Sequence, residues 1–411
     1  MNSHRDWVIQ VRLPRRARRG LWCWSGLAPL LFAFALIASE ARSQEVRVIT
    51  REAQLGGVQL IEISDRSITI RTERGGLETI PMEECVGIIN SSAALQARGS
   101  SAYAPLGLLV LADGQQLPGS PILGATAGSD VLYWRHRWLD RVAVPLDRAA
   151  WAAFRVTAQP PDAGEADVIV LINGDRAEGF ITALRDPVEI EQDGRTTTIA
   201  LDRISAIRLI TPPAAPAPGA KRLWFDEGTV LDVPSISMGD DGNVHFVSPL
   251  GETSKGDFPM PLSRVVGILF DISAMVPLGS ITAHDVEGPV TRYEVPAPEV
   301  DSAERALGLR DVTLRGPLTA RYALPSRASR FMGTARLGEG LPDWPDCELV
   351  IAVDGRELFR ERLSNDRRRL EFDVAIEGAE LSIEVTEGAF GPIGDRVILE
   401  GAMIIVDSHT D

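Results

Sequence analysis

Four short segments of the chain end in nearly the same way, and this repetition limits the folds that the chain can adopt. Each has an apolar residue, then Pro or Ala, then Leu or Met, a polar residue and Arg or Glu, after which a short apolar strand begins. Their spacing of roughly 60 residues indicates tandem copies of one small structural unit. The segments are residues 80–84, 144–148, 199–203 and 260–264.

Upstream of these endings, apolar strands are closed by sharp turns, as at Gly114, Gly174 and Gly228. Four or five short strands, with a marked turn before the last, are typical of small, strongly bent barrels of the SH3 or Sm kind. We therefore predict an all-β protein that begins with tandem SH3/Sm-like β-barrel repeats. The predicted repeats span residues 44–92, 104–156, 166–211 and 221–272, with a Pro/Ala linker at 212–220.

The Asp-Arg pairs in these endings have two interpretations. As structural features, Asp147-Arg148 and Asp202-Arg203 would cap the turn and form a surface ion pair, which contributes less than about 1 kcal/mol. As functional features, the arginines would line a groove shared between units. Turns of this composition are common, which favours the structural interpretation.

The first 43 residues have the composition of a secretory signal peptide. Clustered arginines precede an apolar run at 21–38, and the small residues Ala41 and Ser43 mark a cleavage point before Gln44. An uncleaved anchor is the alternative, because the run is about long enough to span a bilayer. Either way, the sequence predicts export to the periplasm, the cell surface or the extracellular space.

The charge balance bears on the partners that the exported part can have. The chain carries a formal net charge of −15 at pH 7, although its leader is rich in arginine. The remainder is therefore strongly acidic, and it repels phosphate backbones and anionic membrane surfaces. We expect no nucleic-acid partner, and no membrane contact beyond the leader.

Signatures of catalysis and of metal binding are missing from the sequence. It has no metalloprotease motif, phosphate-binding loop, nucleophile elbow or Cys-x-x-Cys pair. His136 stands among Trp and Arg residues, which fits a half-exposed strand, and residues 240–243 fit a hairpin turn better than a calcium loop. Cys85 and Cys347 are predicted to be buried free thiols. We expect a non-catalytic protein with no cofactor and no metal site.

The last third of the chain has longer alternating strands than the repeats, with a clear hairpin turn at Asp354-Gly355. From about residue 279 to 406 it resembles the NPCBM family of carbohydrate-binding modules, which are β-sandwiches of the galactose-binding type. The resemblance implies a jelly-roll β-sandwich at 277–411 and the binding of a glycan. The matching segments, in the family's order, are 307–309, 319–324, 330–335, 350–358, 372–374, 381–385 and 394–397.

Two departures from the family pattern affect the ligand site. Ile398 stands where members of the family carry a tryptophan, and Arg310-Asp311 stand where a histidine is often found. A sugar site needs an aromatic platform with a few fixed polar partners, so the platform must come from other residues.

The residues that remain for this task are Tyr322, Trp344 and Phe390, with Asp395 as a polar partner. We select Tyr322, Trp344 and Asp395 as the ligand-binding candidates. Trp344 lies in a loop rich in Pro and Asp, where it would either stack on a sugar or pack over an edge of the sandwich. Asp395 would hold a loop or a cation, or simply cap a turn.

Three functional hypotheses follow. The first is an exported, non-catalytic binding protein whose C-terminal module binds a glycan at the cell envelope or outside the cell. The second is an envelope scaffold that binds proteins and has lost sugar affinity, in line with Ile398. The third is a hydrolase acting on polysaccharide, because acids are plentiful enough to supply a catalytic pair.

Overall fold

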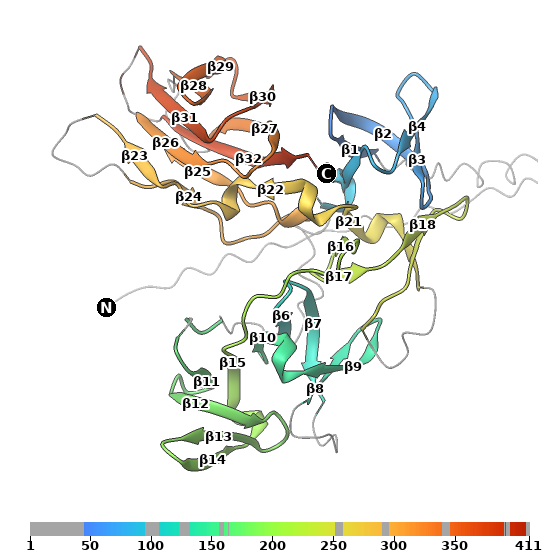
Figure 1. Cartoon of the computed structure of the whole chain (residues 1–411), viewed down its shortest axis with the longest axis vertical. Helices are drawn as coiled ribbons and strands as arrows, with labels where there is room; N and C mark the ends of the chain where they lie inside the picture. Colours follow the sequence, from blue (N-terminus) through green and yellow to red (C-terminus); the bar gives the residue numbers. More distant parts are fainter. Residues whose placement is uncertain are drawn as a thin grey trace, which may run out of the picture. The chain divides into compact units, whose positions relative to one another are not determined.

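The computed structural model describes residues 45–94, 107–122, 131–155, 160–162, 164–250, 258–289, 296–338, 346–389, 391 and 395–407. Almost all regular structure in these residues is β-strand, as Figure 1 shows, and the predicted all-β class is confirmed. The predicted signal peptide at 1–43 lies outside the described residues. Within the described ranges, no helix combines the length and the apolar character that crossing a membrane requires.

The first unit has the topology that the others repeat. Its strands are β1 (Glu45–Thr50), β2 (Gln54–Ile63), β3 (Ser67–Arg71), β4 (Leu77–Pro81) and β5 (Cys85–Asn90). They pair in the order β4-β3-β2-β1-β5. A register shift between Leu60 and Glu62 bends β2, so that the sheet curls over its own apolar face. Ile68 and Ile70, two residues apart on β3, are fully buried on that face.

The second and third units have the same strand order, with the first strand between the second and the last. The second unit consists of β6 (Gly107–Leu111), β7 (Gln116–Pro121), β8 (Val131–His136), β9 (Asp140–Pro145) and β10 (Ala149–Ala153). The third, green in Figure 1, consists of β11 (Asp167–Leu171), β12 (Arg176–Ala183), β13 (Val188–Gln192), β14 (Arg195–Ile199) and β15 (Ile204–Arg208).

The fourth unit differs in its second strand, which is interrupted at Pro234 because proline cannot donate a ladder hydrogen bond. The first strand again lies between the second and the last. The strands are β16 (Lys221–Phe225), β17 (Val230–Val233), β18 (Ile236–Met238), β19 (Asn243–Phe246), β20 (Phe258–Pro261) and β21 (Val265–Leu269).

The repeated sequence ending forms a single turn of 3-10 helix before the last strand, as η2 (Leu146–Arg148), η3 (Leu201–Arg203) and η4 (Leu262–Arg264). In each case the carbonyl of the closing arginine accepts a hydrogen bond from the hairpin between the first two strands. The donors are the backbone N–H groups of Ala112, Ile172 and Asp226, at 2.8, 3.0 and 3.0 Å. The glycine in each hairpin has positive φ, which explains why the turn selects glycine. In these three units the glycine hairpin and the repeated ending are therefore hydrogen-bonded to each other.

The units pair through their last strands. β5 of the first unit pairs antiparallel with β21 of the fourth, and β10 of the second pairs antiparallel with β15 of the third. A shorter bridge at Ile63–Met238 adds to the seam between the first and fourth units, and a bridge at Gln116–Val230 links the second unit to the fourth. One apolar cluster runs from Val46 to Phe270 through all four units. The repeats thus share one core.

The fourth strand of each unit, β4, β9, β14 or β20, pairs only with the third strand within the described residues. No unit closes into a barrel. The predicted small β units are therefore present as strongly bent open sheets, because their last strands pair with another unit and not with their own fourth strand.

The C-terminal region forms the predicted β-sandwich. One sheet has the order β24-β25-β32-β27-β30 with β22 beside β32, and the other has the order β23-β26-β31-β28-β29. Residues from both sheets form one core, in which the rings of Phe331 and Phe372 lie 4.9 Å apart. The strands are β22 (Met275–Pro277), β23 (Asp285–Glu287), β24 (Glu299–Val300), β25 (Val312–Arg315), β26 (Leu318–Ala323), β27 (Ala328–Leu337), β28 (Asp346–Val353), β29 (Arg356–Ser364), β30 (Arg369–Ala375), β31 (Glu380–Glu387) and β32 (Arg396–Val406).

A separate apolar cluster joins the sandwich to the repeats. Three 3-10 turns, η5 (Ile272–Ala274), η6 (Leu278–Ser280) and η7 (Ala306–Gly308), connect the two parts. Leu307 on η7 is 1% exposed and packs over Gly87 of β5 and Gly267 of β21, which lie opposite Leu269 and Ile89 in the seam. Trp224 completes the contact by donating its indole N–H to Glu304.

Candidate functional site

One end of the sandwich gathers polar groups from segments that are distant in the sequence. The N–H of Gly316, just before β26, donates to the carbonyl of Asp395 at 2.7 Å. The N–H of Gly338, just after β27, donates to the carbonyl of Arg396 at 2.8 Å. Ala389, after β31, donates its N–H to Asp346 Oδ2 at 3.0 Å. We call this set of residues, together with Arg362, the loop end.

Asp346, the first residue of β28, is the fixed acid of the loop end. It is 4% exposed, and the Arg362 guanidinium binds both of its oxygens, with Nη2 at 2.6 Å from Oδ2. These hydrogen bonds hold the pKa of Asp346 below its usual range. A Cβ added to Gly388 would lie 1.7 Å from the Asp346 carbonyl oxygen, so only glycine fits there. The Arg362 side chain is 62% exposed, so the ion pair that it forms with Asp346 is accessible from the surface.

Asp395 is the unpaired acid of the same end. It is 3% exposed, and neither carboxylate oxygen accepts a hydrogen bond of ordinary geometry from the described residues, although the backbone N–H groups of Asp346 and Gly388 lie near it. Burial raises its pKa to about 6, the backbone N–H groups of Asp346 and Gly388 offset part of this rise, and the charges of Asp346 and Glu387 add to it. A buried carboxylate without a donor is rare in folded proteins, and it lowers their stability once it is ionised.

The structure separates the three residues that the sequence selected. Tyr322 is 1% exposed in the sandwich core, where burial raises its pKa to about 12 and its hydroxyl has no partner among the described residues. It lies four residues beyond Leu318, about 13 Å further along β26 from the loop end. Trp344 and Phe390 lie outside the described residues, but Trp344 precedes Asp346 by two positions. Asp395 therefore lies buried at the loop end and Tyr322 in the core, so the structure does not bring these two candidates together on one surface.

Sequence reasoning missed Asp346 and Arg362. Asp346 begins β28, whereas Arg362 lies near the end of β29 and is opposite Glu348, so the two side chains meet diagonally and only when the hairpin forms. The signal was present in the predicted strand-turn-strand pattern around Asp354, because counting outward from that turn places the two strand ends beside each other. Ile398, which stands where the resemblance would place a tryptophan, is 8% exposed and pairs with Thr313 and Arg336 inside the sheet.

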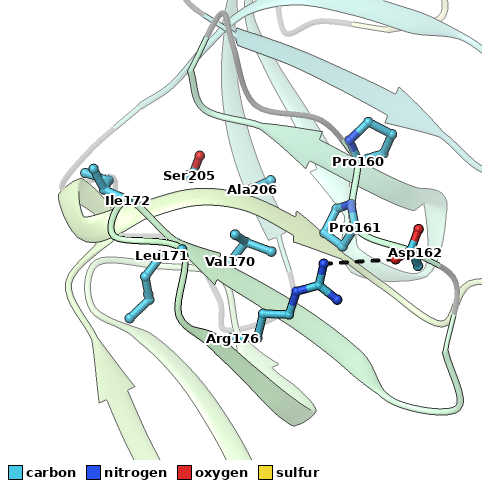
Figure 2. A pocket seen from close by; sticks show the side chains of 10 residues that line it. Pro160, Pro161, Asp162, Val170, Leu171, Ile172, Arg176, Ser205 and Ala206 are labelled. Carbon is cyan, nitrogen blue, oxygen red and sulfur yellow. Dashed lines mark ion pairs between the residues drawn. The ribbon is translucent and has the colours of Figure 1, made fainter.

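The third repeat unit carries an open hollow of about 450 Å³, shown in Figure 2. Its floor is apolar, with Val170 from β11 and Ala206 from β15. Arg176 and Asp162 face each other at its rim, 4.0 Å apart. Both of these side chains are more than half exposed, so the pair is weak. The other lining residues are Pro160, Pro161, Leu171, Ile172, Gly174 and Ser205, which bring no second charged group.

The arginines of the repeated endings serve the turns. Arg148 lies 3.3 Å from Asp113, and Arg264 lies 3.1 Å from Asp226, which is in each case an acid of the adjoining hairpin. Because each arginine is held by the unit it belongs to, these two contacts favour the structural interpretation of the endings over a shared groove.

His136 is buried, and the prediction of a half-exposed strand residue is wrong. Its Nδ1 accepts the backbone N–H groups of Trp138 and Leu139, and its Nε2 lies 3.0 Å from the Thr229 hydroxyl of the fourth unit. With Nδ1 accepting, Nε2 carries the proton and donates it to Thr229. Burial lowers the pKa of His136 to about 4.

The remaining predictions about titratable residues concern a turn and two thiols. Asp241 accepts from the N–H and the side-chain amide of Asn243, which builds the predicted hairpin turn between β18 and β19. Cys85 and Cys347 are buried and free, as predicted, and burial raises both thiol pKa values to about 12. In the described ranges no three His, Cys, Asp or Glu side chains are grouped so as to hold a metal ion.

No protein-family model matches the sequence, and no curated protein matches it. Among solved structures, the carbohydrate-binding module CBM51 of Clostridium perfringens GH95, in complex with methyl-galactose, is 13% identical, with a TM-score of 0.26 over 32% of this chain and 99% of that one. The tandem CBM51 modules of Streptococcus pneumoniae Sp3GH98 are 10% identical, with a TM-score of 0.28 over 58% and 88%. The CBM22 tandem of Paenibacillus barcinonensis Xyn10C is 8% identical, with a TM-score of 0.22 over 90% and 95%.

Proposed function

We propose that this chain is an exported, non-catalytic binding protein that holds a glycan at the loop end of its C-terminal sandwich. The observation that carries the proposal is Asp395, a buried carboxylate whose two oxygens accept no hydrogen bond of ordinary geometry from the described residues. A buried carboxylate held this weakly lowers stability at neutral pH, and hydrogen-bond donors of a bound ligand would stabilise it. The hydroxyl groups of a sugar are such donors.

The surroundings of Asp395 suit a sugar. Arg362 offers N–H donors at the surface beside the fixed acid Asp346, and these polar groups are held rigidly by backbone contacts. Trp344, two residues before Asp346, supplies the aromatic ring on which the sugar stacks. The ordered match to the NPCBM motifs supports the same role. Export rests on the composition of residues 1–43.

The test uses the whole mature chain, residues 44–411, on an array of bacterial, plant and animal glycans, followed by calorimetry with the best ligand. We expect Trp344→Ala and Asp395→Asn to weaken binding at least tenfold. Phe180→Ala is the matched control, because Phe180 is an exposed aromatic residue of the third repeat and is 68% exposed. Its loss leaves binding unchanged. Absence of binding to every glycan would remove the proposal.

The pH dependence of binding gives a second test. Only an ionised carboxylate accepts hydrogen bonds on both oxygens, and burial places the pKa of Asp395 at about 6. Affinity should therefore fall as the pH drops from 7 to 5, and it should be flat over this range in Asp395→Asn. Release of reducing ends or shortened glycan during these measurements would revive the hydrolase hypothesis and contradict the non-catalytic part of the proposal.

A protein-binding scaffold is the second candidate, and one observation favours it. Tyr322 lies in the core and Ile398 fills the family's tryptophan position, which leaves Trp344 and Phe390 as the aromatic candidates for contact with a sugar. Co-purification of the chain from envelope fractions, before and after digestion with glycosidases, separates the two candidates. Protein partners that persist after digestion favour the scaffold.

A further inference from the structure

The unpaired edges of the repeat sheets are not equivalent. Each unit has two outer strands, the fourth and the last, and all four last strands are used in the β5–β21 and β10–β15 seams. The fourth strands pair on one side only within the described residues. An unpaired edge offers backbone N–H and C=O groups to any extended strand, and proteins usually block such edges.

Three of the four units block the fourth strand with proline. Pro81, Pro145 and Pro261 end β4, β9 and β20. Ala200 stands at this position in the third unit, with φ −62° and ψ 133°, and Pro261 adopts nearly the same angles, φ −54° and ψ 133°. The backbone of the third unit therefore accepts proline, yet the blocking residue is absent.

The strand that lacks this block is suited to pairing. β14 reads Arg-Thr-Thr-Thr-Ile, and its first four residues are exposed. Threonine favours extended strands, and the strand contains neither proline nor an acidic residue. If two copies of β14 run antiparallel about Thr197, then Thr196 lies opposite Thr198, and Arg195 lies opposite Ile199. No like charges face each other in this register.

We propose that β14 is a homodimerisation edge, which pairs antiparallel with β14 of a second copy of this chain about a two-fold axis at Thr197. The chain itself shows this mode of association, because copies of the same unit already pair antiparallel through identical strands at β5–β21 and β10–β15. A two-fold pair of this kind is closed and leaves no free edge at β14. A contact of five residues a side is small, so the dimer is weak and depends on concentration.

The register can be tested by charge. The double substitution T196K/T198K places lysine opposite lysine across the axis, whereas T196K/T198E places lysine opposite glutamate. Within one copy, Thr196 and Thr198 lie opposite Glu191 and Glu189 of β13, so T196K/T198K does not weaken the fold. Sedimentation velocity of residues 44–411 from 1 to 200 μM, about the range of weak dimers, should show a dimer for wild type and T196K/T198E, and a monomer for T196K/T198K.

Cross-linking gives an independent measurement. Opposed Cα atoms in an antiparallel pair lie about 4.5–5.5 Å apart, which is within disulfide range. Thr197→Cys should therefore form a covalent dimer under mild oxidation, whereas Glu78→Cys, the matching position on the proline-blocked β4, should not. The native Cys85 and Cys347 are buried and do not interfere. A wild type that stays monomeric at all concentrations, or a T196K/T198K dimer, overturns the proposal.

Discussion

His136 and Thr229 show how a single side-chain contact joins two repeats. The ring belongs to β8 of the second unit, and its hydroxyl partner belongs to the turn before β17 of the fourth. The sequence around His136 predicted partial exposure, because alternation along a strand reports which face a residue lies on but not which distant unit covers that face. The covering turn is 93 residues away in the chain.

The protonation of His136 should make the protein sensitive to acid. The unfolded chain protonates His136 near pH 6.5, whereas the folded chain protonates it only near pH 4. The contribution of neutral His136 to the free energy of unfolding is therefore fully present at neutral pH and is lost as the pH falls from 6.5 to 4. The loss at pH 4 is about 3 kcal/mol. Thermal unfolding of the wild type and His136→Asn between pH 7 and 4.5 checks this. The variant should unfold at a lower temperature at pH 7 but lose less on acidification, and equal slopes would contradict the assignment.

Ionisation of Asp395 should have the opposite effect on stability, because it destabilises the folded state as the pH rises. Its pKa is raised to about 6 by burial, so the folded state holds the proton more tightly than the unfolded state, and stability falls as the pH rises from 4 to 6. Asp395→Asn should therefore stabilise the protein at pH 7 by on the order of 2 kcal/mol and have little effect at pH 4. Urea unfolding at the two pH values measures this difference. A variant that is less stable at pH 7 would show that the carboxylate has a structural donor.

At the scale of elements, β5 and β21 can pair closely because each strand has a glycine, Gly87 or Gly267, where a larger side chain would clash. A Cβ added to Gly87 would lie 2.7 Å from the Ile268 carbonyl oxygen, and one added to Gly267 would lie 2.9 Å from Ala306 Cβ. Both contacts are closer than packed atoms allow, so these glycines permit the two strands and η7 to approach one another.

Gly87→Val should destabilise the protein by on the order of 2 kcal/mol, because the added atoms must displace backbone and not a flexible side chain. Gly56→Ala is the control, since nothing lies within 4 Å of its added Cβ. Differential scanning calorimetry of both variants tests this. Equal thermal unfolding midpoints for the two variants would show that the seam can accommodate a valine side chain at position 87, contrary to the structure.

Most elements of this chain were predictable, and their partners were not. The repeated endings predict a turn before the last strand, which the structure shows as 3-10 helix in three units, and the glycine turns predict the hairpins, because both signals are local. Nothing local in β5 distinguishes pairing with its own β4, which would close a barrel, from pairing with β21. That choice depends on which apolar strand faces meet in three dimensions, and it is why closed barrels were predicted.

At the scale of the whole molecule, the repeats and the sandwich share a core. Met332, Met403 and Ile405 of the sandwich are buried in the same apolar cluster as Val86 and Val266 of the repeats. The Arg51 guanidinium also reaches across, and it donates to the Val406 carbonyl at 2.8 Å. The candidate site was harder to predict than the fold, because Asp346 and Arg362 form an ion pair only once the β28–β29 hairpin has formed. Trp344, by contrast, could be selected from the sequence as an aromatic residue in a loop.

The isolated fragment 277–411 should therefore aggregate more readily than the whole chain, although it contains both sheets of the sandwich. Removing the repeats exposes these methionine and isoleucine side chains as one contiguous apolar patch, which favours aggregation. Light scattering of the fragment and of residues 44–411 at equal concentration tests this. A fragment that is monomeric and melts at the temperature of the whole chain would show that the shared cluster contributes little.

The pairing of the first unit with the fourth has a consequence for the order of assembly. A chain that crosses a membrane from its N-terminus delivers the first unit early, yet β21 follows β5 by about 180 residues. The second and third units, whose last strands are closer in sequence, complete their seam first. Until the fourth unit is available, β5 has an open edge, so the first unit is the part of the incomplete chain that is most exposed to aggregation.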